Sequence, residues 1–266
     1  MTAMVDEPLR IAVDALSSLE ARVPARDGEV RLDRDGDVAW IRLDNPRAHN
    51  ALTVTMMRQL GQALVDLQGW EGAIVAVASA GGGTFCAGGH LGQVRQSLVE
   101  PAAARLMTEC MTTVLDALHG LPQVVVAVVE GAAIGGGAEL TTACDLRVGS
   151  PAATVHFAQV PLGVVCGWGG GSRLMAQVGR RRALRVLAAG EIFSAEAALS
   201  YGLLDAVGPG DAPGLLRLLL GPMFDHDPAA VRAAKAQILA AGDPAAQADA
   251  FLSVWGGEAH RRALGR

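Results

Sequence analysis

The sequence predicts an α/β fold with a helical C-terminal region. Apolar, strand-like runs alternate with stretches of helical periodicity up to Gly171, and the pattern after Gly171 is almost wholly helical. The chain has 266 residues, of which 51% are hydrophobic and 18% are charged, so it can bury one large core or two small ones. No linker divides the chain, and it contains no internal repeat.

Strands and helices alternate in the first half. Residues 1–27 are expected to form an N-terminal extension with one helix, and alternating apolar and polar residues about the turn 35–37 predict a β-hairpin. The next expected elements are a helix over 53–67, a strand over 74–78, a helix over 102–118, and strands over 124–129, 146–148 and 154–157. The expected C-terminal helices cover 172–178, 180–189, 194–201, 213–220, 228–240 and 244–263.

Three consecutive glycines, Gly135, Gly136 and Gly137, are expected to follow the strand of the apolar run 124–129 directly, and they open a segment that has the pattern of a helix start. Glycines let a ligand approach the main chain closely, and the N–H groups at a helix start carry partial positive charge. Glu139 follows within one helical turn. The pattern suggests acyl chemistry, with charge developing on a carbonyl oxygen near an acid or base. The same glycines can instead mark only a tight, packed turn, and they match neither a dinucleotide fingerprint nor a P-loop.

Charge and cysteine usage argue against several classes of function. The formal net charge is −5, and no basic stripe accompanies it, so we expect no nucleic-acid partner. The four cysteines are far apart, which is typical of reduced thiols in a cytosolic protein. No secretory signal is evident, and acidic residues and glycines interrupt the most apolar window, 124–144. We therefore expect a cytoplasmic protein that neither spans nor binds a membrane, with some apolar surface buried between subunits.

An ordered set of motifs resembles the crotonase family, also called the enoyl-CoA hydratase/isomerase family. The resemblance runs from about residue 28 to about residue 240. The matching pieces are Asn45-Pro46 with His49-Asn50-Ala51-Leu52, Phe85 through Leu91, Gly131 through Asp145, Leu162-Gly163 with Gly169-Gly170, and Ala195 through Ala198 with Gly202-Leu203.

The resemblance implies a spiral of ββα units over residues 28–205 and a helical trimerisation region over 206–266. It also implies an acyl-CoA thioester substrate, with coenzyme A as part of that substrate and no separate cofactor or metal, and assembly as a homotrimer or homohexamer. The two backbone N–H groups that stabilise an enolate in the family match Gly89 and Gly136. The implied substrate contacts are Asn50, Ala51, Ala87, Leu162 and Trp168.

Glu139 matches the first of two acidic residues that hydratases of the family use. The second has no counterpart here, because the stretch from Phe157 to Gly163 contains no carboxylate. Water addition commonly needs one group to activate water and another to manage the proton. The missing acid therefore argues against ordinary hydration.

Other details resemble the ethylmalonyl-CoA/methylmalonyl-CoA decarboxylase branch of the family. They are Met56-Met57 with Gln59-Leu60, Trp70, the unbroken run from Gly135 to Asp145, Gly167-Trp168-Gly169-Gly170 with Ser172-Arg173-Leu174, and the short spacing from Phe157 to Gly163. The resemblance thus implies a lyase that removes CO₂ from a short, branched malonyl-type CoA. Two alternatives stay open: an enoyl-CoA hydratase or isomerase that relies on Glu139 alone, and a catalytically silent acyl-CoA-binding protein.

Further side chains have two interpretations each. Glu139 is the first candidate to protonate the enolate; His90, beside Gly89, is the second and can equally be a hydrogen-bonded structural residue. Trp168 can line an acyl pocket or belong to the core. The run Arg180–Arg182 and Lys235 can contact CoA phosphates, whereas a solvated face or a subunit contact is the usual role of such residues.

Overall fold

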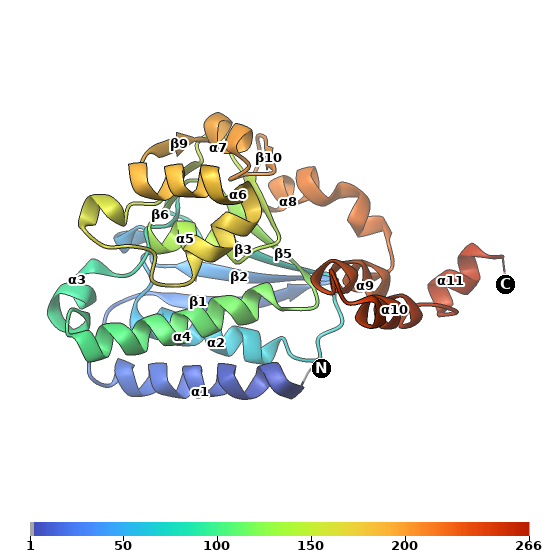
Figure 1. Cartoon of the computed structure of the whole chain (residues 1–266), viewed down its shortest axis with the longest axis horizontal. Coiled ribbons are helices and arrows are strands. Elements are labelled where there is room, and N and C mark those ends of the chain that lie inside the picture. The colour runs from blue at the N-terminus through green and yellow to red at the C-terminus, as the bar shows by residue number, and fades with distance from the viewer. Residues whose placement is uncertain (1–2, 266) are drawn as a thin grey trace.

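The chain builds two β-sheets, described over residues 3–265 in a computed structural model (Figure 1). The first sheet has six strands in the order β1-β2-β3-β5-β7-β10, and the second has four in the order β4-β6-β8-β9. The strands are β1 (Glu29–Asp35), β2 (Val38–Asp44), β3 (Ile74–Ser79), β4 (Thr84–Cys86), β5 (Val124–Val129), β6 (Ala132–Ile134), β7 (Leu146–Gly149), β8 (Thr154–His156), β9 (Ile192–Ser194) and β10 (Ala206–Val207).

From β3 to β8, consecutive strands alternate between the two sheets. The pairs β3–β4, β5–β6 and β7–β8 each give one strand to the first sheet and the next strand to the second. Within the first sheet, β2, β3, β5, β7 and β10 pair in parallel, and only the hairpin strand β1 runs antiparallel to its neighbour. Each of these strand pairs therefore adds one strand to each sheet. The parallel strands and the helices between them confirm the predicted α/β class.

Helices cover the sheets and extend the C-terminal region. They are α1 (Ala3–Glu20), α2 (Val54–Asp66), α3 (Leu91–Gln93), α4 (Pro101–His119), α5 (Gly136–Thr142), α6 (Gly170–Ala189), α7 (Ala195–Tyr201), α8 (Ala212–Leu220), α9 (Pro228–Leu239), α10 (Pro244–Leu252) and α11 (Glu258–Ala263). Helix α1 contains the predicted N-terminal helix and packs against α2 and α4 (Figure 1). The Thr53 hydroxyl caps α2 by accepting a hydrogen bond from the N–H of Met56.

The core has two parts because the central strands are buried on both faces. In β3, Val75 and Val77 pack into the larger part, while Ile74, Ala76 and Ala78 pack into the smaller part with α8 and α9. Successive side chains of a strand point to opposite faces, so a strand covered on both sides must be apolar throughout. This explains the unbroken apolar runs that marked β3 and β5 in the sequence.

The predicted hairpin, the long helices and the longer strands are confirmed, and two expectations are wrong. The glycine turn does not follow β5 directly, because the three-residue strand β6 intervenes and delivers the turn from the second sheet. The helix expected over 244–263 is two helices, α10 and α11, separated by a segment in which Gly256 has a φ of 72°. The predicted break between 178 and 180 is confirmed, since Gly179 interrupts α6 with a φ of 79°.

The C-terminal helices α10 and α11 project from the body of the domain (Figure 1). Several large apolar side chains on and beside them are exposed, including Phe251, Leu252 and Trp255. No helix within residues 3–265 is both long enough and apolar enough to cross a membrane. The proposed boundaries at residues 27 and 205 remain predictions.

Candidate active site

The glycine turn lies between β6 and α5. Gly135 adopts a φ of 55°, which favours glycine, and its N–H donates to the carbonyl oxygen of His156 at 2.8 Å. Gly136 is the first residue of α5, so its own N–H has no partner inside the helix. Gly136 is half-buried, whereas Gly137 and the residues after it in α5 are buried. The turn thus presents one N–H group at the start of a helix and at an accessible position.

A second glycine turn, from Gly88 to His90, meets the first one. Leu52 forms a parallel bridge with Gly89: the N–H of Leu52 donates to the carbonyl oxygen of Gly88 at 2.7 Å, and the N–H of His90 donates to the carbonyl oxygen of Leu52 at 2.9 Å. The bridge uses the residues on either side of Gly89 and leaves its own N–H out of the pairing. A Cβ at Gly88 would lie 2.9 Å from the backbone nitrogen of Gly136, so the two turns touch main chain to main chain. The structure therefore brings Gly89 and Gly136 to one place.

The indole of Trp168 covers both glycines. A Cβ built on Gly136 would overlap the Trp168 ring, and one built on Gly89 would lie 3.7 Å from Trp168 Cζ2. Trp168 is itself 5% exposed. Its side chain thus belongs to the core and lies against both glycines, and its role as the wall of an acyl pocket stays a prediction.

Glu139 is buried, and both of its carboxylate oxygens accept two hydrogen bonds. Its Oε1 accepts from Gln159 Nε2 at 3.0 Å and from the N–H of Gly167 at 3.2 Å. Its Oε2 accepts from the N–H of Trp168 at 2.8 Å and from the N–H of Gly170 at 3.0 Å. A Cβ at Gly170 would lie 2.5 Å from Glu139 Cγ, so the loop fits tightly around the carboxylate. Glu139 therefore anchors the segment 167–170, including the Trp168 backbone. We call Glu139 and these hydrogen bonds the Glu139 latch.

Two partners of this latch are not apparent in the sequence. Gln159 lies in the stretch that the sequence marked only for its missing carboxylate, and its amide reaches Glu139. Arg173 donates to the carbonyl oxygen of Trp168, to Thr142 Oγ1 at 3.3 Å and to Asp116 Oδ1 at 2.6 Å. The contacts of Arg173 with Thr142 and Asp116 span 31 and 57 residues, so no local pattern could have indicated them.

His90 begins helix α3 and acts as its N-terminal cap. Its Nδ1 accepts a hydrogen bond from the N–H of Gln93 at 3.3 Å, and its side chain is half-buried. The side chain of Gln93 in turn accepts from the N–H of Val54 and donates to the carbonyl oxygen of Pro24. The turn that carries Gly89 is therefore fixed both to the start of α2 and to the N-terminal extension.

The remaining predicted contacts lie in different environments. Asn50 is fully buried, and its side chain accepts from the N–H of Asn45 and donates to the carbonyl oxygens of Gly81 and Thr84. It thus orders the loop before the bridge residue Leu52. Ala51 is buried, and Ala87 is half-buried beside Gly88. Leu162 is exposed on the loop that leads to Trp168, next to the exposed Val160, Val164 and Val165.

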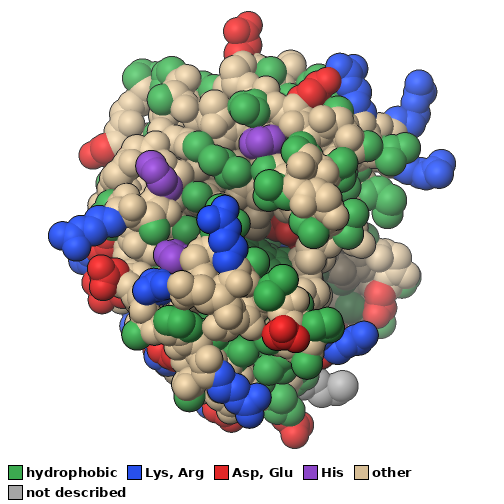
Figure 2. All heavy atoms as spheres, turned by 90° about the vertical axis from the view of Figure 1, so that its left-hand side faces the viewer, with side chains coloured by type: hydrophobic (Ala, Val, Ile, Leu, Met, Phe, Trp, Pro, Cys, Tyr) green, Lys and Arg blue, Asp and Glu red, His purple; other side chains and the backbone are tan. Residues whose placement is uncertain are grey.

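This face of the domain, on the left in Figure 1, is hollowed near its centre (Figure 2). Hydrophobic side chains gather around the hollow, with a basic side chain at its edge and an acidic side chain inside it (Figure 2). Helix α3 and the loop before α6 lie on this side (Figure 1). A hollow with a mostly apolar rim and a few polar groups is typical of a ligand site.

Lys235 corrects one sequence interpretation. Its ammonium group lies 2.6 Å from Asp145 Oδ2 and donates to the carbonyl oxygen of Gln123 at 2.9 Å, and the residue is 7% exposed. Burial lowers the pKa of Lys235, while the adjacent Asp145 carboxylate raises it. Asp145 also accepts from the N–H of Val125, so the pair ties α9 to the end of α5 and to β5. A lysine held in this way is not a contact for CoA.

Burial keeps the four cysteine side chains as unreactive thiols. Burial raises the pKa of Cys86, Cys144 and Cys166 to about 12, and it also raises the pKa of Cys110. Cys86 is therefore a small core residue. Residues 3–265 hold no group of three or more His, Cys, Asp or Glu side chains that could bind a metal.

Comparison with known proteins gives consistent matches. The family described as enoyl-CoA hydratase/isomerase matches residues 33–251. Ethylmalonyl-CoA decarboxylase of Xenopus laevis is 34% identical over 249 residues, which cover 90% of this chain and 83% of the relative, and that of Danio rerio is 34% identical over 254 residues, covering 91% and 83%. The crystal structure of an enoyl-CoA hydratase from Bacillus anthracis superimposes with a TM-score of 0.82 at 27% identity, covering 89% of this chain and 95% of that one.

Proposed function

This chain belongs to the enoyl-CoA hydratase/isomerase family, and from that starting point we propose that it decarboxylates a short, branched malonyl-type CoA thioester, such as methylmalonyl- or ethylmalonyl-CoA. The observation that carries the proposal is the meeting of the Gly89 and Gly136 turns beneath Trp168. The relatives named ethylmalonyl-CoA decarboxylase, at about one third identity, support the choice of reaction.

The proposed reaction uses the two backbone N–H groups as an oxyanion hole. The bond between the α-carbon and the carboxylate breaks, CO₂ leaves, and the electron pair moves through the α-carbon onto the thioester oxygen. The N–H groups of Gly89 and Gly136 donate to that oxygen as its negative charge grows. A proton delivered to the α-carbon then completes the shorter acyl-CoA. An apolar wall such as Trp168 disfavours the charged carboxylate and so assists its loss.

The two candidate acids, Glu139 and His90, are given different roles in this proposal. Glu139 already accepts four hydrogen bonds, so we propose that its main task is to hold the Trp168 loop. His90 is half-buried beside Gly89, and its Nδ1 is engaged with the N–H of Gln93. Its Nε2 is therefore the better candidate to deliver the proton. We retain Glu139 as the alternative donor, since its carboxylate lies within the same group of loops.

An amide lies next to Glu139, where hydration would need a second acid. Gln159 donates to Glu139, and its neutral amide cannot serve as a general acid or base for water addition, which favours decarboxylation over hydration. The structural likeness to an enoyl-CoA hydratase keeps the hydratase as the second candidate.

Incubation of the purified protein with methylmalonyl-, ethylmalonyl- and crotonyl-CoA tests the proposal. We expect CO₂ release from at least one malonyl-type thioester and no hydration of crotonyl-CoA. Mass spectrometry of the products measures both reactions. Hydration of crotonyl-CoA without CO₂ release would establish the second candidate instead. Binding of all three thioesters without turnover would identify a silent binding protein.

We further propose that the protein forms a homotrimer, or a homohexamer built from two trimers, through its C-terminal helices. Phe251 and Trp255 line a cavity of about 570 Å³ between α9, α10 and α11, and Leu252 is 60% exposed beside it. Large apolar side chains on projecting helices are typical of surfaces that another subunit covers.

Leu252→Arg is expected to reduce the assembly to monomers, because a charge at an apolar interface must be desolvated. The matched control is Ile11→Arg on α1, where the side chain is 61% exposed and the assembly should persist. Sedimentation velocity of the wild-type protein and both variants measures the mass. A monomeric wild type would refute the proposal.

We also propose a cytoplasmic location and coenzyme A as part of the substrate, with no separate cofactor.

A further inference from the structure

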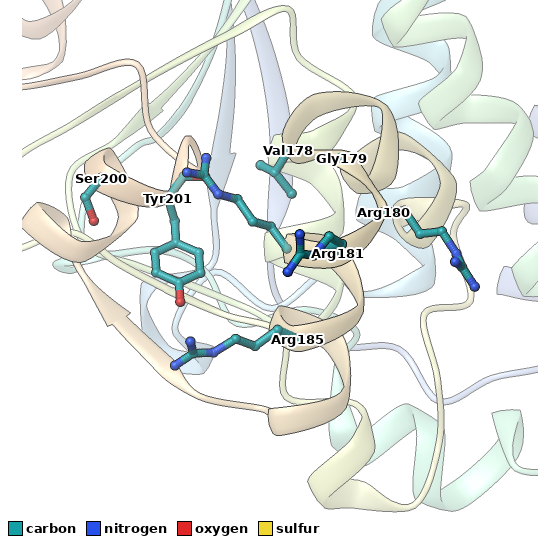
Figure 3. A pocket seen from close by; sticks show the side chains of 8 residues that line it. Val178, Gly179, Arg180, Arg181, Arg185, Ser200 and Tyr201 are labelled. Carbon is teal, nitrogen blue, oxygen red and sulfur yellow. The ribbon is translucent and has the colours of Figure 1, made fainter.

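One cavity is separate from the candidate active site and is lined by arginines. It has a volume of about 710 Å³ and lies between the second half of α6 and the end of α7. Its lining residues are Val178, Gly179, Arg180, Arg181, Arg182, Arg185, Ser200 and Tyr201 (Figure 3). Gly179 is nine residues beyond Gly170, so at 1.5 Å per helical residue the cavity starts about 13 Å from the Glu139 latch.

The positive charge of this cavity is poorly balanced. Arg185 lies 3.8 Å from Glu191, and within residues 3–265 no other carboxylate is within 4 Å of a lining arginine. No acidic residue lines the cavity, although the whole chain carries a net charge of −5. Clustered guanidinium groups repel one another unless an anion lies between them.

The start of a helical segment at Arg180 adds to the excess positive charge of the cavity. Gly179 breaks α6 with a φ of 79° and a ψ of 157°, so a new helical segment starts at Arg180. The first turn of a helix has unpaired N–H groups and partial positive charge, and it favours acidic residues rather than cations. Here the first three positions are arginines. An anion in the cavity would offset both the side-chain charges and the helix end.

Tyr201 orders the arginines. The guanidinium carbons of Arg182 and Arg185 lie 5.9 and 5.7 Å from the centre of its ring, and Arg182 Nη1 donates to the Tyr201 carbonyl oxygen at 3.4 Å. In Figure 3, Arg185 extends toward Tyr201, whereas Arg180 points away from it. Because the arginines already use the tyrosine ring, a ligand has little aromatic surface to stack on. The arrangement suits a compact anion with several oxygens.

We propose that this cavity binds a diphosphate group, with Arg181, Arg182 and Arg185 as its main ligands. Guanidinium groups match phosphate oxygens in paired hydrogen bonds, and several of them can surround one diphosphate. The group can belong to inorganic pyrophosphate, to a nucleoside diphosphate or to the tail of a second CoA molecule. The diphosphate is the shared chemistry of all three.

Calorimetric titration of the full chain with inorganic pyrophosphate tests the proposal. We expect saturable binding that weakens by at least about tenfold in Arg181→Ala/Arg185→Ala, because charge-assisted hydrogen bonds to the anion are lost. The control is Arg10→Ala/Arg34→Ala, which removes the same charge from exposed positions elsewhere and should bind as the wild type does. Thermal melting of each variant verifies that it is folded.

Two outcomes would overturn the proposal: no saturable pyrophosphate binding by the wild type, or an equal loss in both double variants. The second outcome would mean that net charge alone attracts the anion. Titrations with ADP and with CoA, in the wild type and in Arg181→Ala/Arg185→Ala, then distinguish the sources, because only a carrier that uses the cavity loses affinity in that variant. The result does not depend on whether the protein decarboxylates thioesters.

Discussion

Replacing Gly136 with alanine is expected to lower kcat for decarboxylation by about 10²–10³, the loss that follows removal of one oxyanion donor. The added Cβ would overlap the indole of Trp168, so either the ring or the N–H of residue 136 must move. Gly136 begins a helix, and alanine is compatible with its backbone, so the fold should persist. Steady-state kinetics with the best malonyl-type thioester and a thermal melt measure the two effects separately.

Gly89→Ala is the matched control for this prediction. Its Cβ would meet Trp168, Met57 and Val94 only at ordinary contact distances of 3.7 to 3.9 Å, and the backbone N–H is retained. Turnover within a few-fold of the wild type is therefore expected. Adding Trp168→Leu to Gly136→Ala should recover part of the loss, because the two side chains compete for one space. A Gly136→Ala enzyme with wild-type kcat would show that the N–H of Gly136 does not contact the developing charge.

Glu139→Gln is expected to lower the free energy of unfolding by about 3 kcal/mol, because an amide NH₂ group would face two of the four donors that now point at a carboxylate. For a chain of this size the melting temperature should fall by roughly 10 °C. Turnover should fall as well, since the loop that carries Trp168 loses its anchor. Chemical denaturation, thermal melting and kinetics well below the melting temperature measure these effects.

The control removes an acid that has no such partners. Glu109→Gln on α4 changes the same net charge at an exposed position and should leave both stability and turnover nearly unchanged. The opposite pattern for Glu139→Gln, a wild-type melting temperature with turnover abolished, would identify Glu139 as a proton donor to the substrate and refute its role as a latch.

Local patterns in the sequence predicted the parts of the fold that are long enough to show a period. The hairpin of β1 and β2 and the helix α2 are examples, since each repeats its apolar spacing several times. Strands β4, β6 and β9 have three residues each, too few for alternation to be visible. That is why these three strands of the second sheet, which delivers the Gly136 turn, were not predicted, whereas β8 was expected over 154–157.

The site was predictable where a motif carries its chemistry in the backbone. Gly89 and Gly136 could be named in advance and are found together. The setting of Glu139 could not be predicted, because its four donors come from residues 20 to 31 positions later in the chain. The burial of Lys235 could not be predicted for the same reason. Its partner Asp145 is distant in sequence, and a lysine in a helix gives no sign of being buried.

The contact between the Gly88 and Gly136 turns has an evolutionary consequence. Its donors belong to the peptide main chain, so they persist when the side chains around them change. If these donors form the proposed oxyanion hole, substitutions at positions such as 90 and 159 can alter how protons are handled without removing it. A scaffold organised in this way can acquire a new reaction through a few replacements at its rim, while the proposed enolate site is inherited unchanged.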